Sequence, residues 1–316
     1  MECEEHDSGD PQKGNRGGEM TEKAKKFGGS WTEDKLNRIR KYMAAYTRIM
    51  SKRPYHFIYV DAFAGSGYIK KKDENNGTMS LFPEMAEDDS RKIIDGSAKI
   101  ALQVEPRFNE YLFIEKGKGG CVGLEALREE FPDKAPDIGI IHDDANSYLK
   151  KLCHERDWKK ERILVFVDPY GMSVEWETIA DLAGTKAADI WILFPLGVAV
   201  NRMLKKDGDI PTRWVECLDK FFGNHEWFDA FYRTEVVNDM FGQVEKTWKE
   251  TDFDAIGKYF VRRLETVFEG VAQNPLALIN SRGIPIFLLC FATANPYAVD
   301  VALKIAQDIL KRKPNG

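Results

Sequence analysis

Five short apolar runs lie in the first two thirds of the chain, and amphipathic segments separate them. The runs cover residues 56–60, 111–114, 138–141, 163–167 and 190–194. None of them alternates polar with apolar residues, which is typical of parallel strands that are buried on both faces. The segment before the first run carries Leu36, Ile39 and Met43 at helical spacing. Its bases Lys35, Arg38, Arg40 and Lys41 lie mostly off this apolar face, and they are interpreted either as a solvated face or as a strip that faces phosphates. The pattern predicts an α/β protein whose mostly parallel sheet is covered by helices on both faces.

The carboxy-terminal part of the chain has a different pattern. Two apolar runs, 276–279 and 285–291, flank the turn sequence Asn280-Ser281-Arg282-Gly283, and an apolar helix is expected over about 296–311. This arrangement predicts an antiparallel hairpin at the end of a seven-stranded sheet. Residues of about 197–274 contain no comparable run and carry many aromatic residues among charges. We therefore expect a helical insertion there.

Two segments do not have the composition of a packed domain. Residues 1–26 are polar and nearly free of aromatic residues, so we expect a disordered tail ahead of an ordered domain over 27–316. The polar stretch 70–95 holds Asn75-Asn76-Gly77 and an acidic run. It is interpreted either as plain disorder or as a lid over a ligand site.

Composition and charge narrow the functional classes only a little. The chain has 316 residues with a formal net charge of −5, so the overall charge does not indicate a nucleic-acid binder, although a local basic face would be enough. Its five cysteines are scattered and form no C-x-x-C pair, which disfavours a disulfide framework or a metal site and favours the cytoplasm. No apolar run is long enough to span a bilayer.

Acidic residues follow four of the predicted strands, namely Asp61, Glu115, Asp143 with Asp144, and Asp168. A single acid at a strand end is most simply a helix N-cap. Four of them along one sheet edge suit a ligand with several hydroxyl and amino donors and a cationic centre, and S-adenosylmethionine is such a ligand. After the first strand, Gly65, Ser66 and Gly67 allow backbone N–H groups to approach a ligand closely. Neither the G-x-G-x-x-G pattern nor the phosphate-loop pattern is met.

The stretch Asp61-Ala62-Phe63-Ala64-Gly65-Ser66-Gly67 resembles the first motif of class I S-adenosylmethionine-dependent methyltransferases, especially those that methylate amino groups of nucleic acids. The resemblance implies a Rossmann-like fold and cofactor contacts from Asp61, Phe63, Gly65, Ser66 and Gly67. Phe113-Ile114-Glu115-Lys116 is similar to the second motif, which implies that Glu115 holds the ribose. Asp144-Ala145-Asn146 resembles the third motif, which implies that Asp144 lies beside the adenine, with Asp143 and Ala145 in the same stretch.

Asp168-Pro169-Tyr170-Gly171 stands where these enzymes carry the motif of an acid or amide, two prolines and an aromatic residue. This implies a catalytic segment in which Asp168 accepts a hydrogen bond from the target amino group and Tyr170 stacks on a flipped base. The second proline is missing, and the segment is closer to the D-P-F-G of tRNA guanine-N2 methyltransferases, so the target atom stays open. For Tyr170 the alternative is a core tyrosine. We also expect Trp31 and Lys35 near the methionine carboxylate of the cofactor.

A narrower resemblance covers almost the whole predicted domain. Segments 30–36, 61–67, 168–172, 194–197, 201–202 and 280–283 resemble the three-Cys-motif partner protein family, TcmP. The resemblance implies a separate partner that bears a three-cysteine motif. This chain has no three-cysteine cluster of its own, which agrees with the role of the partner protein.

Taken together, the sequence predicts an S-adenosylmethionine-dependent methyltransferase that acts on an exocyclic amino group of a nucleic-acid base, in RNA or DNA, together with a three-Cys-motif protein. Two alternatives remain open. One is a non-catalytic or regulatory subunit that binds S-adenosylmethionine, and the other is a methyltransferase of small molecules.

Overall fold

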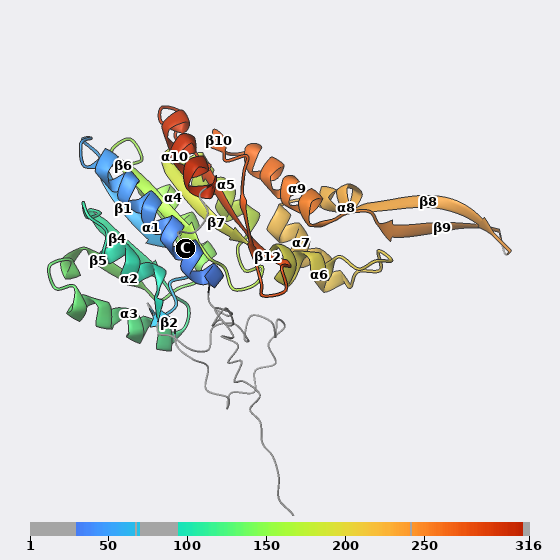
Figure 1. Ribbon diagram of the computed structural model, residues 1–316, viewed down its shortest axis with the longest axis horizontal. Helices are drawn as coiled ribbons and strands as arrows, with labels where there is room; N and C mark the ends of the chain where they lie inside the picture. Colours follow the sequence, from blue (N-terminus) through green and yellow to red (C-terminus); the bar gives the residue numbers. More distant parts are fainter. Residues whose placement is uncertain (1–29, 67, 70–93, 241, 312–316) are drawn as a thin grey trace, which may run out of the picture.

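The computed structural model describes residues 30–66, 68–69, 94–240 and 242–311 (Figure 1). The predicted disordered tail, Gly67 and most of the polar stretch 70–95 lie outside the described residues. Two short strands, β2 (Tyr68–Ile69) and β3 (Ile94–Asp95), pair with each other on either side of that stretch.

A mixed sheet of eight strands forms the centre of the molecule. Its strands are β1 (His56–Asp61), β4 (Glu110–Ile114), β5 (Ile138–Ile141), β6 (Glu161–Val167), β7 (Ala188–Phe194), β10 (Gly270–Val271), β11 (Leu276–Ile279) and β12 (Pro285–Thr293). They run in the order β5-β4-β1-β6-β7-β12, and β10 and β11 both pair with the far edge of β12. The sheet therefore has the seven strand positions that the sequence predicts, with the last position shared by two short strands.

The first five of these strands in the order are parallel, and β12 runs antiparallel to β7. From β1 the chain builds β4 and β5 on one side, and it then returns to build β6 and β7 on the other side. The sheet thus has a topological switch point between β1 and β6. In open α/β sheets, ligands bind beyond the carboxyl ends of the strands at such a point.

Helices cover both faces of the sheet, as predicted. One face is covered by α1 (Ser30–Met50), α2 (Ser97–Leu102), α3 (Lys118–Glu130) and α10 (Val299–Lys311). The other is covered by α4 (Ala145–Glu155), α5 (Trp176–Gly184), α7 (Thr212–Phe222), α8 (Glu226–Phe231) and α9 (Phe253–Glu265). Figure 1 shows α1 and α10 on the near face. Alternate residues of one strand enter different cores, for example Tyr59 on the α1 side and Val60 on the α4 side. The α/β class with a mostly parallel sheet is confirmed.

Two of the four bases of α1 are buried and not on the predicted solvated face, whereas Arg40 and Lys41 are exposed as predicted. Lys35 and Arg38 are 5% and 3% exposed, although both stand among the polar residues of the helix pattern. Arg38 donates to the side chain of Asp34 and to the backbone carbonyl of Ile309 in α10, and Lys35 pairs with an acid at the sheet edge. Burial of a charged group is tolerated when it is paired in this way.

The insertion between β7 and β10 is helical only in part. It contains η3 (Leu196–Val200), α6 (Asn201–Met203), α7, α8 and α9, as well as an antiparallel hairpin of β8 (Tyr232–Asp239) and β9 (Gly242–Lys249). The prediction of a helical insertion is wrong for residues 232–249. Their β-branched residues fit strands better than helices, because such side chains have restricted rotamers in helices. Figure 1 shows the hairpin as an arm that extends beyond the body.

The predicted terminal hairpin is confirmed. β11 and β12 pair antiparallel, and the Asn280 side chain accepts hydrogen bonds from the backbone N–H groups of Arg282 and Ile284 in the turn. Gly283 has a φ of +74°, which few other residues adopt without strain. No described helix has both the length and the apolar character needed to cross a bilayer.

Candidate functional site

The acids that the sequence singles out lie at one edge of the sheet. They follow β5, β4, β1 and β6, which are neighbours in that order. Asp61 is paired in register with Phe113 of β4 and with Phe166 of β6. Glu115 and Asp168 each come two residues after these partners, so both lie just beyond the carboxyl end of β1 on either side of Asp61. Asp61 and Asp168 flank the switch point.

Asp61 is a fully buried carboxyl group. Its Oδ2 is 3.5 Å from the hydroxyl of Tyr59, whereas Oδ1 has no hydrogen-bond partner among the described residues. Burial, reinforced by the negative charge of Asp168, raises the pKa of Asp61 to about 7, although the nearby Ser97 hydroxyl, the backbone N–H of Phe63 and the charge of Lys35 oppose the shift. An orphaned acceptor of this kind is costly to bury, so it marks a position where a donor is expected to bind.

Asp168 is held by a lysine from the amino-terminal helix. Lys35 Nζ lies 2.5 Å from Asp168 Oδ2, and the two side chains are 7% and 28% exposed. The ammonium also lies over the ring of Trp31, 5.4 Å from its centroid. Lys35, which we expected at the methionine carboxylate, thus bonds to the predicted catalytic acid, and its contact with a cofactor stays a prediction.

Trp31 contributes a second orphaned polar atom next to this pair. Its ring packs against Phe287 of β12 with 5.2 Å between the centroids, and its Nε1 is buried without a hydrogen-bond partner in the described part of the chain. An unpaired donor on Trp31 and an unpaired acceptor on Asp61 therefore both belong to residues near Lys35, whose ammonium lies over the Trp31 ring and whose charge acts on Asp61. A ligand that carries both an anionic and an ammonium group would satisfy both.

The loop after β1 is held in place by its neighbours. The backbone N–H groups of Ala62 and Ala64 donate to the carbonyls of Phe166 and Ile114, at 2.9 and 3.0 Å. Gly65 has a φ of +60°, a conformation that glycine adopts readily. The side chain of Phe63 is half-buried and that of Ala64 is buried. The loop is therefore a preformed wall of the site.

Glycines of α3 allow this helix to approach the loop. A Cβ atom on Gly123 would lie 2.6 Å from the backbone oxygen of Ser66, and one on Gly120 would lie 2.9 Å from that of Gly65. Gly120 also lies against the side chain of Glu115, whose Oε1 accepts a hydrogen bond of 2.5 Å from the backbone N–H of Gly117. The carboxylate of Glu115 is thus oriented at the start of α3, and its residue is partly exposed.

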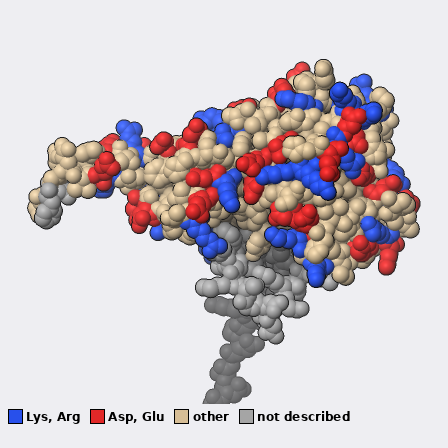
Figure 2. All heavy atoms as spheres, turned by 180° about the vertical axis from the view of Figure 1, so that it is seen from behind, with Lys and Arg blue, Asp and Glu red and all other residues tan. Residues whose placement is uncertain are grey.

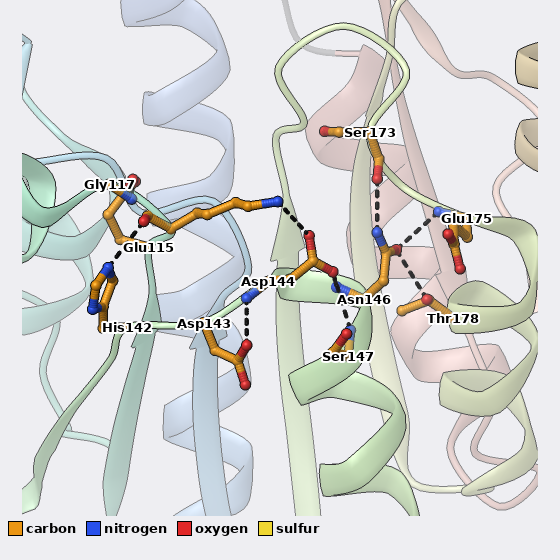
Figure 3. A network of polar contacts seen from close by, with 11 residues as sticks. Glu115, Gly117, His142, Asp143, Asp144, Asn146, Ser147, Ser173, Glu175 and Thr178 are labelled. Carbon is orange, nitrogen blue, oxygen red and sulfur yellow. Dashed lines mark hydrogen bonds and ion pairs between the residues drawn. The ribbon is translucent and has the colours of Figure 1, made fainter.

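Asp144 caps a helix, which is the simpler of the two roles considered for such an acid. Its Oδ1 accepts hydrogen bonds from the backbone N–H groups of Asn146 and Ser147 at the start of α4, and its Oδ2 lies 3.4 Å from Lys116 Nζ (Figure 3). Burial raises the pKa of Asp144, but the hydrogen bond from Ser147 and the contacts with Lys116 outweigh it and hold the pKa below its usual value. Asp143 accepts from the backbone N–H of Asp144, and Ala145 is buried. Contacts of these three residues with an adenine stay predictions.

Asn146 links this corner to the segment after β6. Its amide nitrogen donates to the carbonyl of Ser173, and its Oδ1 accepts from the backbone N–H of Glu175 and the hydroxyl of Thr178 (Figure 3). The side chain therefore ties α4 to the loop that carries Asp168 and Tyr170. The sequence singles out Asn146 only through its place in the third motif. Its role as a link could not be predicted, because its hydrogen-bond partners are 27 or more residues away in the sequence.

Tyr170 projects to the surface, so the alternative of a core tyrosine is wrong. It is 61% exposed, while Pro169 before it and Gly171 after it are buried, and Gly171 has a φ of +67°. The buried neighbours hold the loop and leave the ring accessible. An exposed ring on a loop held by buried neighbours is the arrangement that a stacking platform requires.

Comparisons with known proteins leave the family open. No family model matches the chain, so the resemblance to TcmP stays a prediction, and no curated protein matches it either. Among solved structures, the chain is similar to a Legionella pneumophila protein of the DUF519 family, with 15% identity, a TM-score of 0.35, and coverage of 73% of this chain and 92% of that one. It is also similar to the putative methyltransferase yhhF from Escherichia coli (13% identity, TM-score 0.27, 67% and 87% coverage). Spermidine synthase from Thermotoga maritima is a further match (8% identity, TM-score 0.38, 90% and 66% coverage).

Proposed function

We propose that this protein is an S-adenosylmethionine-dependent methyltransferase that acts on an exocyclic amino group of a nucleic-acid base. One observation carries the proposal: Glu115, Asp61 and Asp168 lie side by side at the carboxyl edge of β4, β1 and β6, at the switch point of the sheet. Asp61 lies there with a buried carboxylate oxygen that has no partner among the described residues.

The residues at this edge fit the cofactor in four respects. The orphaned Oδ1 of Asp61 suits the ammonium of its methionine part, and the orphaned Nε1 of Trp31, next to Lys35, suits the carboxylate. Glu115, partly exposed two residues beyond the register partner of Asp61, suits ribose hydroxyls. The loop of Gly65 and Ser66 follows β1 and lies against α3, and its backbone can contact the ligand.

The bound cofactor would supply an electrophilic methyl group on a sulfonium. The protein residues then have to position an amino acceptor, and Asp168 does this by accepting an N–H hydrogen bond through the oxygen that does not face Lys35. Lys35 holds the carboxylate in place through its ion pair with Oδ2. We regard Lys35 as a positioning residue for Asp168.

A flat acceptor that can stack suits the exposed ring of Tyr170 better than a small aliphatic amine. Base–aromatic stacking contributes about 1–3 kcal/mol, which corresponds to about 5- to 150-fold in binding. The face in Figure 2 carries acids and bases side by side and has no broad positive patch.

Transfer of a labelled methyl group from S-adenosylmethionine to bulk RNA and to bulk DNA tests the proposal. We expect transfer by the wild type, loss with Asp168→Ala, and a reduction of about 5- to 150-fold in apparent acceptor affinity with Tyr170→Ala. Tyr297→Ala is the matched control, because Tyr297 is 94% exposed and follows the end of β12 at the opposite edge of the sheet. Equal reductions in the two tyrosine variants would contradict a platform role for Tyr170.

A second candidate is a regulatory subunit that binds the cofactor without transferring its methyl group. The ion pair between Lys35 and Asp168 favours it, because the pair occupies one oxygen of the proposed catalytic acid. The same assay separates the two when it is repeated with a three-Cys-motif protein and with small amines as acceptors. Cofactor binding without transfer to any acceptor, with or without that protein, would support the regulatory subunit. Transfer to small amines alone would identify a small-molecule methyltransferase.

A further inference from the structure

The arm formed by β8 and β9 is paired only with itself. Its strands pair in an unbroken antiparallel register from Tyr232 opposite Lys249 to Asp239 opposite Gly242, and no other described strand joins them. Residues 233–238 are all exposed, and Figure 1 shows the arm extending away from the body. An isolated two-stranded hairpin is at best marginally stable in water, so an additional strand would stabilise the arm.

Two backbone hydrogen bonds show which groups of the arm point outward. Glu250 N donates to Phe231 O at 2.9 Å, so these residues bond inward across the hairpin. Lys249 N donates at 2.9 Å to Lys206 O, which lies outside the hairpin. Because inward and outward residues alternate in an antiparallel ladder, Thr234, Val236 and Asn238 of β8 point their backbone groups outward. On β9 the outward residues are Gln243, Glu245 and Thr247.

The outer edges of β8 and β9 are protected to different degrees against pairing with a strand of another molecule. The base of β9 is covered by the bond to Lys206, and its central outward residue is the charged Glu245. The outward residues of β8 are uncharged, and Val236 at the centre is 60% exposed. Natural proteins protect sheet edges with charges and covering loops. The residues of β8 whose backbone points outward carry no charge, and no other described strand pairs with them.

We propose that two copies of this protein associate by pairing their β8 strands antiparallel, about a two-fold axis at Val236, to form one four-stranded sheet. In this register Val236 faces Val236 of the second copy, and Thr234 faces Asn238. Among residues 234–238 this register places no like charges opposite each other, and the exposed Val236 side chains of the two copies meet at the axis.

Neighbouring symmetric registers of β8 are less favourable. An axis at Glu235 places two glutamates opposite each other, and an axis at Val237 pairs only residues 235–239, because β8 ends at Asp239. On β9, axes at Glu245 and Lys246 likewise place like charges together, which is destabilising. An axis at Thr234 pairs only residues 232–236, because β8 begins at Tyr232, whereas the axis at Val236 pairs residues 233–239.

One pair of strands is a small contact compared with the roughly 1,200 Å² or more of a stable interface. We therefore expect a reversible dimer that forms at high protein concentration. Its closed two-fold symmetry stops the association at two copies.

Sedimentation equilibrium of the full chain over a wide concentration range tests the proposal. The wild type is expected to double in mass at high concentration, and Val236→Pro is expected to remain a monomer. Proline removes an N–H that points away from β9, so the hairpin keeps its own ladder. The matched control is Glu245→Pro, which places a proline at the outward position directly opposite Val236 and should still dimerise. A wild type that stays monomeric, or equal loss of dimer in both proline variants, would overturn the proposal.

A cysteine at the axis provides a second test that does not depend on proline. Position 236 is the only one that faces its own copy, so Val236→Cys is expected to cross-link two chains under mild oxidation. Asn238→Cys, which faces position 234, is expected not to, and peptide mapping identifies the cysteines involved. Cross-linking of Asn238→Cys in preference to Val236→Cys would rule out this register.

Discussion

At the scale of single residues, the carboxyl edge of the sheet gathers charges that have little contact with water. Asp61 is fully buried, Lys35 is 5% exposed, and Asp168 is partly buried. Lys35 is the cation that balances both carboxylates, since it bonds to Asp168 and its charge also acts on Asp61. Its removal should therefore affect folding as well as any chemistry at the site.

Lys35→Met should lower the free energy of unfolding by about 2 kcal/mol, because it leaves Asp168 unpaired near the buried Asp61. Breaking a fully buried pair costs about 3–5 kcal/mol, and the partial exposure of Asp168 reduces this figure. Urea unfolding measures the effect. Lys41→Met is the control, since Lys41 is an exposed lysine of the same helix. An equal change in both variants would show that the pair contributes nothing.

The pKa of Asp189 leads to a prediction of how the unfolding free energy depends on pH. Asp189 lies near the amino-terminal end of β7, opposite to the carboxyl ends of the parallel strands. It is 8% exposed and accepts a hydrogen bond of 2.7 Å from Tyr42. Burial raises its pKa to about 6, although hydrogen bonds from Thr293 and Tyr42 oppose the shift. An unfolded aspartate has a pKa of about 3.9, so between about pH 4 and 6 only the folded protein holds this proton. The unfolding free energy should therefore fall as pH rises through that window, by up to about 1.4 kcal/mol per pH unit.

Asp189→Asn keeps an acceptor for Tyr42 but cannot titrate, so its unfolding free energy should fall less steeply between about pH 4 and 6. Asp61, with its pKa raised to about 7, adds a slope of the same sign in both proteins. Urea unfolding at several pH values compares them. Parallel curves for the two proteins would contradict the buried, protonated state of Asp189.

Much of the site could be predicted at this scale, since strand ends can be located from the apolar runs and Asp61, Glu115 and Asp168 follow them directly. The partner of Lys35 could not, because the two residues are 133 positions apart and only packing of α1 on the sheet brings them together. Asp144 was ambiguous, since a helix cap and a ligand contact require the same residue at the same place.

At the scale of elements, the glycines of α3 connect helix packing to the ligand loop. The Cβ of Gly123→Ala would lie 2.6 Å from the backbone oxygen of Ser66 and would displace the loop or the helix. We expect this variant to weaken binding of S-adenosylmethionine at least tenfold, as measured by calorimetry. Gly119→Ala is the control, because a Cβ there meets nothing within 4 Å. Unchanged binding in Gly123→Ala would show that the loop does not contact the ligand.

The insertion shows where sequence patterns fail for an element. Its helices α7, α8 and α9 follow the aromatic residues that suggested them, and Phe194 and Phe260 stack with 4.2 Å between their centroids. The hairpin between them is exposed, so its strands have no buried face to impose an alternating pattern. Because the hairpin sequence has no such pattern, residues 232–249 were predicted to be helical like the segments on either side of them.

At the scale of the whole molecule, the order of strands follows from the chain. Parallel strands joined by helices, and a change of direction at β1, place four acid-bearing strand ends along one edge. The sequence indicated these strands because burial on both faces produces uninterrupted apolar runs. The division of the last strand position between β10 and β11 was not predicted, since the two residues of β10 are too few to form a pattern.

The central claim is that this edge binds S-adenosylmethionine through Asp61, and titration calorimetry of the wild type and Asp61→Asn tests it most directly. Asp189→Asn is the control, because it removes another buried carboxyl at the opposite edge of the sheet. We predict one binding site in the wild type, unchanged affinity in Asp189→Asn, and affinity about 10- to 150-fold weaker in Asp61→Asn, as for loss of a charged hydrogen bond. No binding by the wild type, or equal affinity in Asp61→Asn, would contradict the claim.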